Sequence, residues 1–364
     1  MVEPRDEILT MPGYTPGRSV EMVARELGLK DVIKLASNES LWGTSERVLA
    51  AASRSLLSLY QYPEVVPLPL VELLAERSGF SPAEILVGNG ADELLRLVAT
   101  VYVKPGQQVI YPTPSFAAYA YGASLMGAQG VAVSLQANGA MDLEAMADRI
   151  DSNTALVYLC SPNNPTGAIF RQQEWDRFLE RVEGRALIVV DQAYREFVDD
   201  KDYARIEDAI QQGLAVAMVR TFSKLYGLAG ARVGWAAAPA PVIDLMRRVR
   251  EPFSLNAIGI AAATEALRDC EYFDHVRQET LALRRWLQIE LTRRGLSVLE
   301  SQANFLTFAC PIDATDMARR LEQQGIIIRP TTSFGLPQHC RVSIAPKPML
   351  ERFVHGLDRI LAEA

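Results

Sequence analysis

Four short segments of the chain combine residues whose types and spacing could do chemistry. Each directly follows an apolar run, and they read G-N-G-A-D-E at residues 88–93, S-P-N-N-P-T-G at 161–167, D-Q-A-Y at 191–194 and R-T-F-S-K-L-Y-G-L-A-G-A-R-V-G-W at 220–235. Only six of the 37 basic residues are lysine, so a mechanism that needs a nucleophilic amine has few candidates. Lys224 lies between an apolar run and a glycine-rich turn, where burial would lower its pKa and favour amine chemistry.

The first segment predicts a binding site for an anion. A glycine turn between a strand and a helix points free backbone N–H groups and the positive end of the helix dipole at one spot. Its glycines match neither the dinucleotide-binding pattern nor the Walker loop. An ordinary strand-to-helix turn, with Asp92 stabilising the first helical turn, is the alternative interpretation.

The second and third segments predict polar groups at the ends of two buried strands. Ligands of open α/β sheets bind at the carboxyl ends of strands, and two prolines around Asn163 and Asn164 would hold a side-chain amide there. Asp191 ends an apolar strand, where a carboxylate is costly unless a cation meets it, and Tyr194 can lie over the same spot. A loop that precedes a helix and an aspartate that caps a helix are the respective alternatives.

The elements that must position these segments alternate between short apolar runs and amphipathic stretches, which indicates an α/β fold. Several runs are continuously apolar, as expected of strands buried on both faces of a parallel sheet. Apolar side chains at helical spacing predict helices at residues 92–103 and 172–182. The predicted strands of the central sheet are 85–87, 108–111, 130–135, 155–160, 186–190, 215–220 and 232–237.

The pattern changes after Pro252, which predicts a second, smaller α+β domain. An Arg-rich amphipathic stretch at about residues 257–294 predicts one long helix, and a closing helix is expected from about Met349. The first 35 residues are expected to form an arm that joins neither core. The short strands expected in the small domain are 304–309, 326–329 and 341–344, and the predicted parts of the chain are an arm at 1–35, a large domain at 36–251 and a small C-terminal domain at 252–364.

Composition excludes several classes of protein. The 364 residues suggest two domains or one large one, at roughly 100–200 residues per domain. A net charge of −7 gives no electrostatic case for a nucleic-acid partner. Four widely spaced cysteines and three histidines argue against a disulfide framework or a metal site and favour a reducing compartment. The start of the chain lacks the apolar region of a signal peptide, and no run reaches the ~20 apolar residues of a membrane helix, so we expect a cytoplasmic protein without a membrane partner.

The ordered motifs resemble those of fold-type I pyridoxal-phosphate-dependent aminotransferases, and most closely the histidinol-phosphate aminotransferase family. Further segments extend the resemblance over nearly the whole chain: P-G-Y-T-P-G at 12–17, K-L-A-S-N-E at 34–39, Y-Q-Y-P-E at 60–64 and C-R-V-S-I at 340–344. The resemblance implies an aspartate-aminotransferase-like fold, in which helices flank a mostly parallel sheet in the large, cofactor-binding domain. It also implies pyridoxal 5′-phosphate as cofactor, an amino donor and a 2-oxo acid as substrates, and a homodimer with shared active sites.

The resemblance implies catalytic and cofactor-binding roles for residues of the central motifs. Lys224 would form a Schiff base with the cofactor and later carry the proton between substrate and cofactor. Asp191 would pair with the protonated ring nitrogen, which supplies the cation that its burial requires. Asn164 and Tyr194 would hydrogen-bond the phenolic oxygen of the ring. The cofactor phosphate would be held by Gly90, Ala91, Asp92, Thr221, Ser223 and Arg232.

The resemblance assigns other residues to the ring, the second subunit and the substrate. Phe116 would stack on the ring, with a core phenylalanine as the alternative. Tyr62 would reach the neighbour's cofactor phosphate, with a packed loop tyrosine as the alternative. Arg341 would clamp the α-carboxylate of the substrate. The other residues that would contact substrate are Arg329 and Tyr14 at its far end, Asn38 and Asn164.

Three positions depart from the family pattern. The segment that borders the substrate pocket reads N-E-S-L-W-G at 38–43 instead of N-E-N-P-L-G, so Trp42 could stack on an aromatic substrate. Gln192 replaces a glutamate, which leaves Asp191 and Tyr194 in place, and Ala345 replaces a glycine.

The resemblance leaves three kinds of function open. The first is transfer of an amino group from histidinol phosphate to 2-oxoglutarate, giving imidazole acetol phosphate and glutamate, with an aromatic amino-acid aminotransferase as the alternative of the same chemistry. The second is an amino-acid-phosphate decarboxylase or a specialised-metabolism enzyme, against which Arg341 argues because transamination holds the carboxylate away from the breaking bond. The third is a non-enzymatic cofactor-binding module like that of some transcription regulators, but the chain has no basic DNA-binding extension.

We predict that Lys224 carries the cofactor. Borohydride reduction followed by peptide mapping is expected to find the pyridoxyl group on Lys224, and a label on any other lysine would contradict this mechanism. Lys224→Ala should still bind the cofactor through its phosphate but lose turnover by orders of magnitude, because the nucleophile and the proton carrier are both removed.

Overall fold

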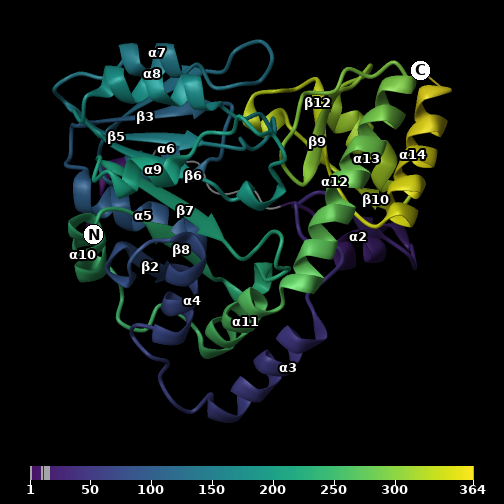
Figure 1. The fold of residues 1–364 in the computed structure, drawn as a ribbon. Coiled ribbons are helices and arrows are strands. Elements are labelled where there is room, and N and C mark those ends of the chain that lie inside the picture. Colours follow the sequence, from purple (N-terminus) through teal and green to yellow (C-terminus); the bar gives the residue numbers. More distant parts are fainter. Residues whose placement is uncertain (1, 10, 12–16, 364) are drawn as a thin grey trace.

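The computed structural model describes residues 2–9, 11 and 17–363, and a seven-stranded sheet forms the centre of this part of the chain (Figure 1). The strand order is β2-β8-β7-β6-β5-β3-β4, and among these described strands only β8 runs against the others. The predicted central strands are all present, with ends that differ by one or two residues. They are β2 (Ile85–Gly88), β3 (Gln108–Thr113), β4 (Gln129–Ser134), β5 (Thr154–Cys160), β6 (Leu187–Asp191), β7 (Val216–Thr221) and β8 (Gly234–Ala237).

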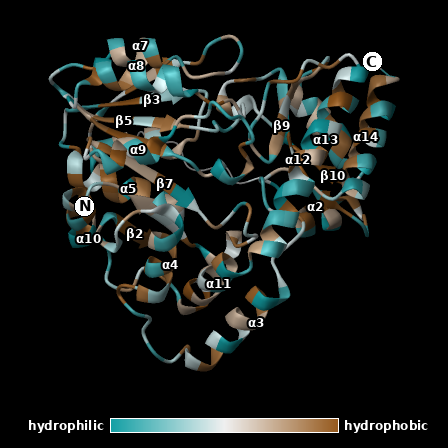
Figure 2. Ribbon diagram, in the orientation of Figure 1, coloured by the Kyte–Doolittle hydropathy of each residue, from teal (hydrophilic) through white to brown (hydrophobic). Residues whose placement is uncertain are grey.

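Helices cover both faces of this sheet, because its strands present apolar side chains on both sides. In β5, Val157 and Leu159 join one buried core while Leu156 and Tyr158 join the other. Figure 2 shows hydrophobic residues gathered on the strands of this sheet and polar ones on the outer helix faces. The first face is covered by α4 (Leu68–Ser78), α7 (Leu143–Asp148), α8 (Gln172–Val182), α9 (Ile206–Gln211) and α11 (Ala257–Arg268), and the second by α5 (Gly90–Tyr102), α6 (Ala118–Leu125) and α10 (Ala240–Val249).

A smaller core, which we call the small core, lies to the right in Figure 1. It contains an antiparallel sheet of order β11-β12-β9. The predicted strand at 326–329 is two strands in different sheets, since β10 (Ile326–Ile327) pairs in parallel with β1 (Ile33–Lys34) while β11 (Arg329–Pro330) joins the antiparallel sheet. The other elements of the small core are β9 (Phe305–Ala309), α13 (Ala314–Glu322), β12 (His339–Ser343) and α14 (Lys347–Leu361).

The end of the predicted arm belongs to the small core. Ile33 and Leu35, at alternate positions of the segment that pairs with β10, are buried there. The prediction that the first 35 residues join neither core is therefore wrong for these two side chains, because an extended segment points alternate residues into the same core. The other described helices before the large sheet are α1 (Asp6–Leu9), α2 (Val20–Leu27) and α3 (Glu46–Ser55).

The stretch at 257–294 forms two helices instead of one. Asp269, with φ −95° and ψ 62°, separates α11 from α12 (Cys270–Arg293). Aspartate favours such positions over helix interiors because its side chain competes for backbone N–H groups. Helix α12 contributes Phe273 and Val276 to the first core of the large sheet, and Leu287 to the small core. It therefore runs through both cores, and the division of the chain at residue 252 stays a prediction.

The lengths and compositions of the helices also bear on whether the chain could span a membrane. In the described part of the chain, no helix combines the length and the apolar character needed to cross a bilayer.

Candidate active site

The four motifs meet at the carboxyl ends of the central parallel strands. In the register of the sheet Asp191, the last residue of β6, lies beside Cys160 of β5 and Val219 of β7. The segments that follow these strands therefore leave the sheet side by side, at the edge where α/β proteins bind ligands. The register therefore brings the ends of β5, β6 and β7 to one edge of the sheet.

Asp191 is a buried carboxylate with two donors. The Tyr119 hydroxyl donates to Oδ2 over 2.8 Å and the Ala193 backbone N–H donates to Oδ1 over 3.0 Å. Burial raises the pKa of Asp191 to about 6, although both hydrogen bonds favour the ionised form. The next helical turn, η3 (Arg195–Phe197), has Tyr194 at its N-cap, so Asp191 does not cap a helix. Its charge instead requires a cation at the strand end.

Lys224 carries an amine of lowered pKa. Its Nζ donates to the Ser37 carbonyl over 3.4 Å and lies 5.5 Å from the centre of the Tyr194 ring. Burial, followed by the positive charge of Arg341, lowers the pKa of Lys224 to about 8. A larger fraction of this amine is therefore neutral near pH 7 than of an ordinary lysine, as a nucleophile or a proton acceptor requires.

Tyr194 keeps its proton and has a fixed partner. Burial raises the pKa of Tyr194 to about 12, so the phenol is protonated near neutral pH. Asn38 Nδ2 donates to the Tyr194 hydroxyl over 3.0 Å, which leaves the Tyr194 proton available to an acceptor in the site. Asn38 was predicted to contact substrate, and that contact stays a prediction. In the structure Asn38 is buried with φ 56°, and its amide bonds Tyr194 and Ser343.

The predicted phosphate-binding residues surround the start of α5. Arg232, with φ 54°, points Nη1 at the Ser223 hydroxyl over 3.4 Å and Nη2 at Asp92 over 3.3 Å, while Thr221 donates to Ser223 over 2.9 Å. Gly90 lacks a side chain where Arg232 lies, since a Cβ there would be 2.4 Å from Arg232 Nη2. The described contacts include no capping bond from the side chain of the N-cap residue of α5, so the first N–H groups face this cradle without one.

Two arginines lie on neighbouring strands at the other side of the site. Arg329 of β11 is directly opposite Arg341 of β12, and both guanidinium groups lie 5.8 Å from the centre of the Phe334 ring. Arg341 donates to Asn164 Oδ1 and, over 2.7 Å, to the Ala36 carbonyl. Arg329 donates to the Ser333 hydroxyl over 3.3 Å. The motifs of Asn164 and Arg341, far apart in sequence, therefore touch.

The remaining predicted residues lie farther from these contacts. Phe116 meets Tyr119, the donor to Asp191, edge-on at 5.9 Å, and its predicted stacking on the cofactor ring stays a prediction. Tyr62 is 81% exposed and stacks on Phe253 at 4.6 Å, so its predicted contact with a second subunit stays a prediction. Tyr14 lies outside the described residues.

Trp42 has a packing role that the sequence did not indicate. It packs against both the first core of the large sheet and the small core, and its carbonyl accepts a bond from the Tyr272 hydroxyl over 2.9 Å. The neighbouring Gly43 carbonyl lies so close to Gly227 that a Cβ on Gly227 would be 2.2 Å from it. The segment at 38–43, which departs from the family pattern, therefore packs closely against the loop that follows Lys224.

Sequence reasoning missed three residues of the site. Tyr119 holds Asp191, Phe334 lies between the two arginines, and Asn304 donates to the Asn38 carbonyl over 3.1 Å. Tyr119 lies in α6, Phe334 in the short turn η5 (Thr332–Phe334) and Asn304 directly before β9, and no local signal in the sequence marks any of them. The Tyr119 hydroxyl finds its acceptor, Asp191, only in the folded molecule, where α6 lies near the end of β6.

A lysine of lowered pKa, a buried carboxylate and an anion cradle at one sheet edge are the parts that an enzyme dependent on pyridoxal phosphate brings together. The sequence model of the class I and II aminotransferases matches residues 30–357, and the chain belongs to that family.

Relatives and solved structures agree with this class. The chain is 41% identical over 359 residues to histidinol-phosphate aminotransferase of Symbiobacterium thermophilum, covering 99% of each, and 37% identical to that of Moorella thermoacetica, covering 98% of this chain and 93% of the relative. The crystal structure of the Sinorhizobium meliloti enzyme of that name, in complex with pyridoxal 5′-phosphate, superposes with a TM-score of 0.90 at 28% identity and covers 100% of this chain and 98% of its own. A Thermus thermophilus aspartate aminotransferase double mutant gives 0.83 at 25% identity, covering 98% and 100%. The predicted fold class and family resemblance are confirmed.

The described residues fit pyridoxal phosphate on chemical grounds. Its phosphate matches the cradle formed by Arg232, Ser223 and the start of α5. Its protonated ring nitrogen matches the buried carboxylate of Asp191, and its aldehyde matches the amine of Lys224. The individual roles of these residues stay predictions.

Removing the Tyr119 hydroxyl is expected to weaken cofactor binding on the acid side. In Tyr119→Phe the carboxylate loses a donor that favours its ionised form, so the pKa of Asp191 rises further above about 6. We expect the pH at which the apoprotein loses affinity for pyridoxal phosphate to rise by about 0.5–1 unit, measured by fluorescence titration. Tyr158→Phe is the matched control, because Tyr158 stacks on Tyr119 at 4.9 Å but bonds the Leu95 carbonyl. Equal profiles for the two variants would show that the Tyr119 bond does not set this pKa.

Proposed function

We propose that this chain transfers an amino group from histidinol phosphate to 2-oxoglutarate, giving imidazole acetol phosphate and glutamate. The observation that carries the substrate choice is the pair of arginines, Arg329 and Arg341, at directly opposed positions of two strands. The names of the relatives support the same substrate.

Opposed like charges destabilise a sheet, so such a pair indicates a site for concentrated negative charge. Histidinol phosphate carries a phosphate and no carboxylate, whereas 2-oxoglutarate carries two carboxylates, and one site must accept both in turn. Two guanidinium forks, both against the Phe334 ring, can share a phosphate dianion or take one carboxylate each. Arg341 would then hold the α-carboxylate of the acceptor, as predicted, and Arg329 its far end.

The cofactor supplies an electron sink that stabilises negative charge at the substrate's Cα. Lys224 is placed to accept the Cα proton and return it, because the lowered pKa lets the amine act in both directions near neutral pH. Asp191 would hold the proton on the ring nitrogen. Tyr194 and Asn164 would donate to the phenolic oxygen, and the bond from Arg341 to Asn164 Oδ1 turns the Asn164 NH₂ group away from that arginine.

We also propose a homodimer with shared active sites. Residues 56–68 carry an unusual density of exposed apolar side chains, and Tyr62 lies within this stretch. If a second copy of the chain covers this segment, Tyr62 of each subunit can contact the cofactor phosphate of the other subunit. The exposed apolar residues are Leu56, Leu57, Leu59, Tyr60, Tyr62, Val65, Val66 and Leu68.

Substrate preference tests the arginine pair. We expect kcat/KM to favour histidinol phosphate over phenylalanine by at least ~100-fold, because phenylalanine offers one carboxylate to Arg341 and an uncharged side chain that leaves Arg329 without an anionic partner. Arg329→Ala should remove most of that preference, whereas Arg319→Ala, at an exposed position of α13, should leave it unchanged. Equal or faster turnover of phenylalanine or tyrosine by the wild-type enzyme would point to a general aromatic aminotransferase.

The oligomeric state tests the apolar segment. Sedimentation velocity is expected to show a dimer, and Leu57→Glu, at a side chain 84% exposed, should shift it toward monomer with loss of activity. Ile289→Glu, 51% exposed on α12, is the control and should remain dimeric. A fully active wild-type monomer at assay concentration would refute shared sites.

A further inference from the structure

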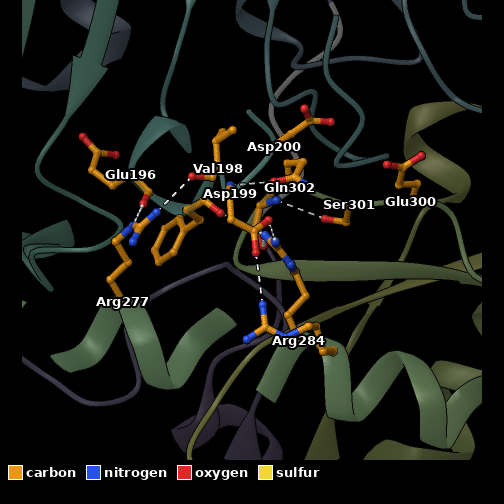
Figure 3. Close-up of polar contacts among 12 residues, drawn as sticks. Glu196, Val198, Asp199, Asp200, Arg277, Arg284, Glu300, Ser301 and Gln302 are labelled. Carbon is orange, nitrogen blue, oxygen red and sulfur yellow. Dashed lines mark hydrogen bonds and ion pairs between the residues drawn. The ribbon is translucent and has the colours of Figure 1, made fainter. Parts of the chain in front are cut away.

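Two arginines of helix α12 hydrogen-bond the main chain just after Tyr194. Arg277 and Arg284 lie about two helical turns apart and therefore on one face of α12. Arg277 donates to the Glu196 carbonyl over 2.6 Å and to the Val198 carbonyl over 3.0 Å, and Arg284 donates to the Phe197 carbonyl over 3.0 Å. Three consecutive carbonyls at the end of η3 thus receive guanidinium donors from one helix (Figure 3). Cations are favourable there because the last carbonyls of a helical turn have no partner within it.

Arg284 also ties this segment to the small-core side of the site. Its side chain is 5% exposed and donates to the Ala303 carbonyl over 3.2 Å and to Asp199 Oδ1 over 2.7 Å. Its neighbour Arg285 is 60% exposed and bonds only the other Asp199 oxygen among the described residues, over 3.1 Å. Asp199 accepts both arginines, and its backbone N–H bonds Gln302 over 2.9 Å (Figure 3).

A second path leads from Ala303 back to Tyr194. The next residue, Asn304, donates to the Asn38 carbonyl over 3.1 Å, and Asn38 Nδ2 donates to the Tyr194 hydroxyl over 3.0 Å. Ser343 accepts the Asn38 backbone N–H over 2.9 Å and donates to Asn38 Oδ1 over 3.2 Å. Because Oδ1 is used in this way, the NH₂ group of Asn38 must face Tyr194.

We infer that Arg284 is a positioning residue that fixes the Tyr194 hydroxyl, by closing a ring of contacts through Phe197, Ala303, Asn304 and Asn38. One side of the ring holds the backbone of Tyr194, and the other holds its hydroxyl. The two sides meet at Arg284, which bonds the carbonyls of Phe197 and Ala303 with the same Nη1, and the Asp199 N–H bond to Gln302 adds a link beside it. Without it, the main chain of Tyr194 and the amide that orients its hydroxyl lose this common anchor.

The inference rests on the proposed use of pyridoxal phosphate and predicts a spectroscopic effect. A Tyr194 hydroxyl that donates to the phenolic oxygen favours the negative charge on that oxygen. The phenolic oxygen shares a proton with the nitrogen that joins Lys224 to the cofactor, and it bears its negative charge without that proton once the nitrogen is deprotonated. A well-placed Tyr194 therefore lowers the pKa of that nitrogen, and a displaced one raises it.

The test compares absorbance titrations of the holoenzyme from pH 5 to pH 10 or so for four proteins beside the wild type. Arg284→Met should raise the midpoint by about 0.5–1 pH unit and lower kcat by about 5–10-fold, with a smaller change in KM. Tyr194→Phe should raise the midpoint further, and the double variant should match Tyr194→Phe, because a residue acting through Tyr194 has no effect once the hydroxyl is gone. Arg285→Met, which alters the same Asp199 on the same helix, should leave the midpoint unchanged.

Two results would overturn the inference. An unchanged midpoint in Arg284→Met with a lower melting temperature would show that Arg284 only stabilises the fold. Additive shifts in the double variant would show that it acts elsewhere in the site. If Arg284→Met does not fold, Asp199→Asn weakens the same anchor at a half-exposed position and should shift the midpoint in the same direction. A wild-type protein that binds no pyridoxal phosphate would instead contradict the proposed function.

Discussion

The carboxylate of Asp191 at the end of β6 is the constraint on which the rest of the site depends. Burial raises its pKa from an ordinary 3.8 to about 6, which corresponds to roughly 3 kcal/mol against the charged form. This cost is what remains after the bonds from Tyr119 and the Ala193 N–H have offset part of the desolvation, and a cation must offset it. A strand that ends in such a group is at its most stable with a protonated ligand beside it, so the sheet itself favours a resident cofactor.

The groups proposed to act on substrate come from the opposite side of the site. Arg341 lies on a strand of the small-core sheet, and the segment of Ser37 and Asn38 follows β1. Both reach the motifs of the large sheet, Arg341 through Asn164 and Ser37 through Lys224. The proposed binding of cofactor and recognition of substrate therefore depend on different parts of the chain, which meet only in the folded molecule.

The central strands and the motif residues could be predicted because their signals are local. Apolar runs mark β5, β6 and β7; Asp191 ends β6, and Asn164 and Lys224 lie within four residues after β5 and β7. The side chains that support these residues could not be predicted, since Tyr119 and Arg284 lie in ordinary helices and Asn304 lies directly before β9, all far away in sequence. The apolar pattern predicted one continuous helix at 257–294, but Asp269, a residue unfavourable in helix interiors, separates it into α11 and α12. The burial of Ile33 and Leu35 depends on a strand almost 300 residues later, which no local window contains.

That pairing of β1 with β10 sets an order of events during synthesis. Residues 33–38 leave the ribosome early, yet the strand that receives them and the Ser343 hydroxyl that holds Asn38 are made near the end. Contacts so distant in sequence form late because a long loop must close first. The large sheet can collapse while translation continues, but the Ser37 carbonyl beside Lys224 and the Asn38 amide on Tyr194 are fixed only after residues 326–343 are made. The nascent chain therefore carries Lys224 without these neighbours, and the proposed site is complete only once residues 326–343 fold back onto residues 33–38.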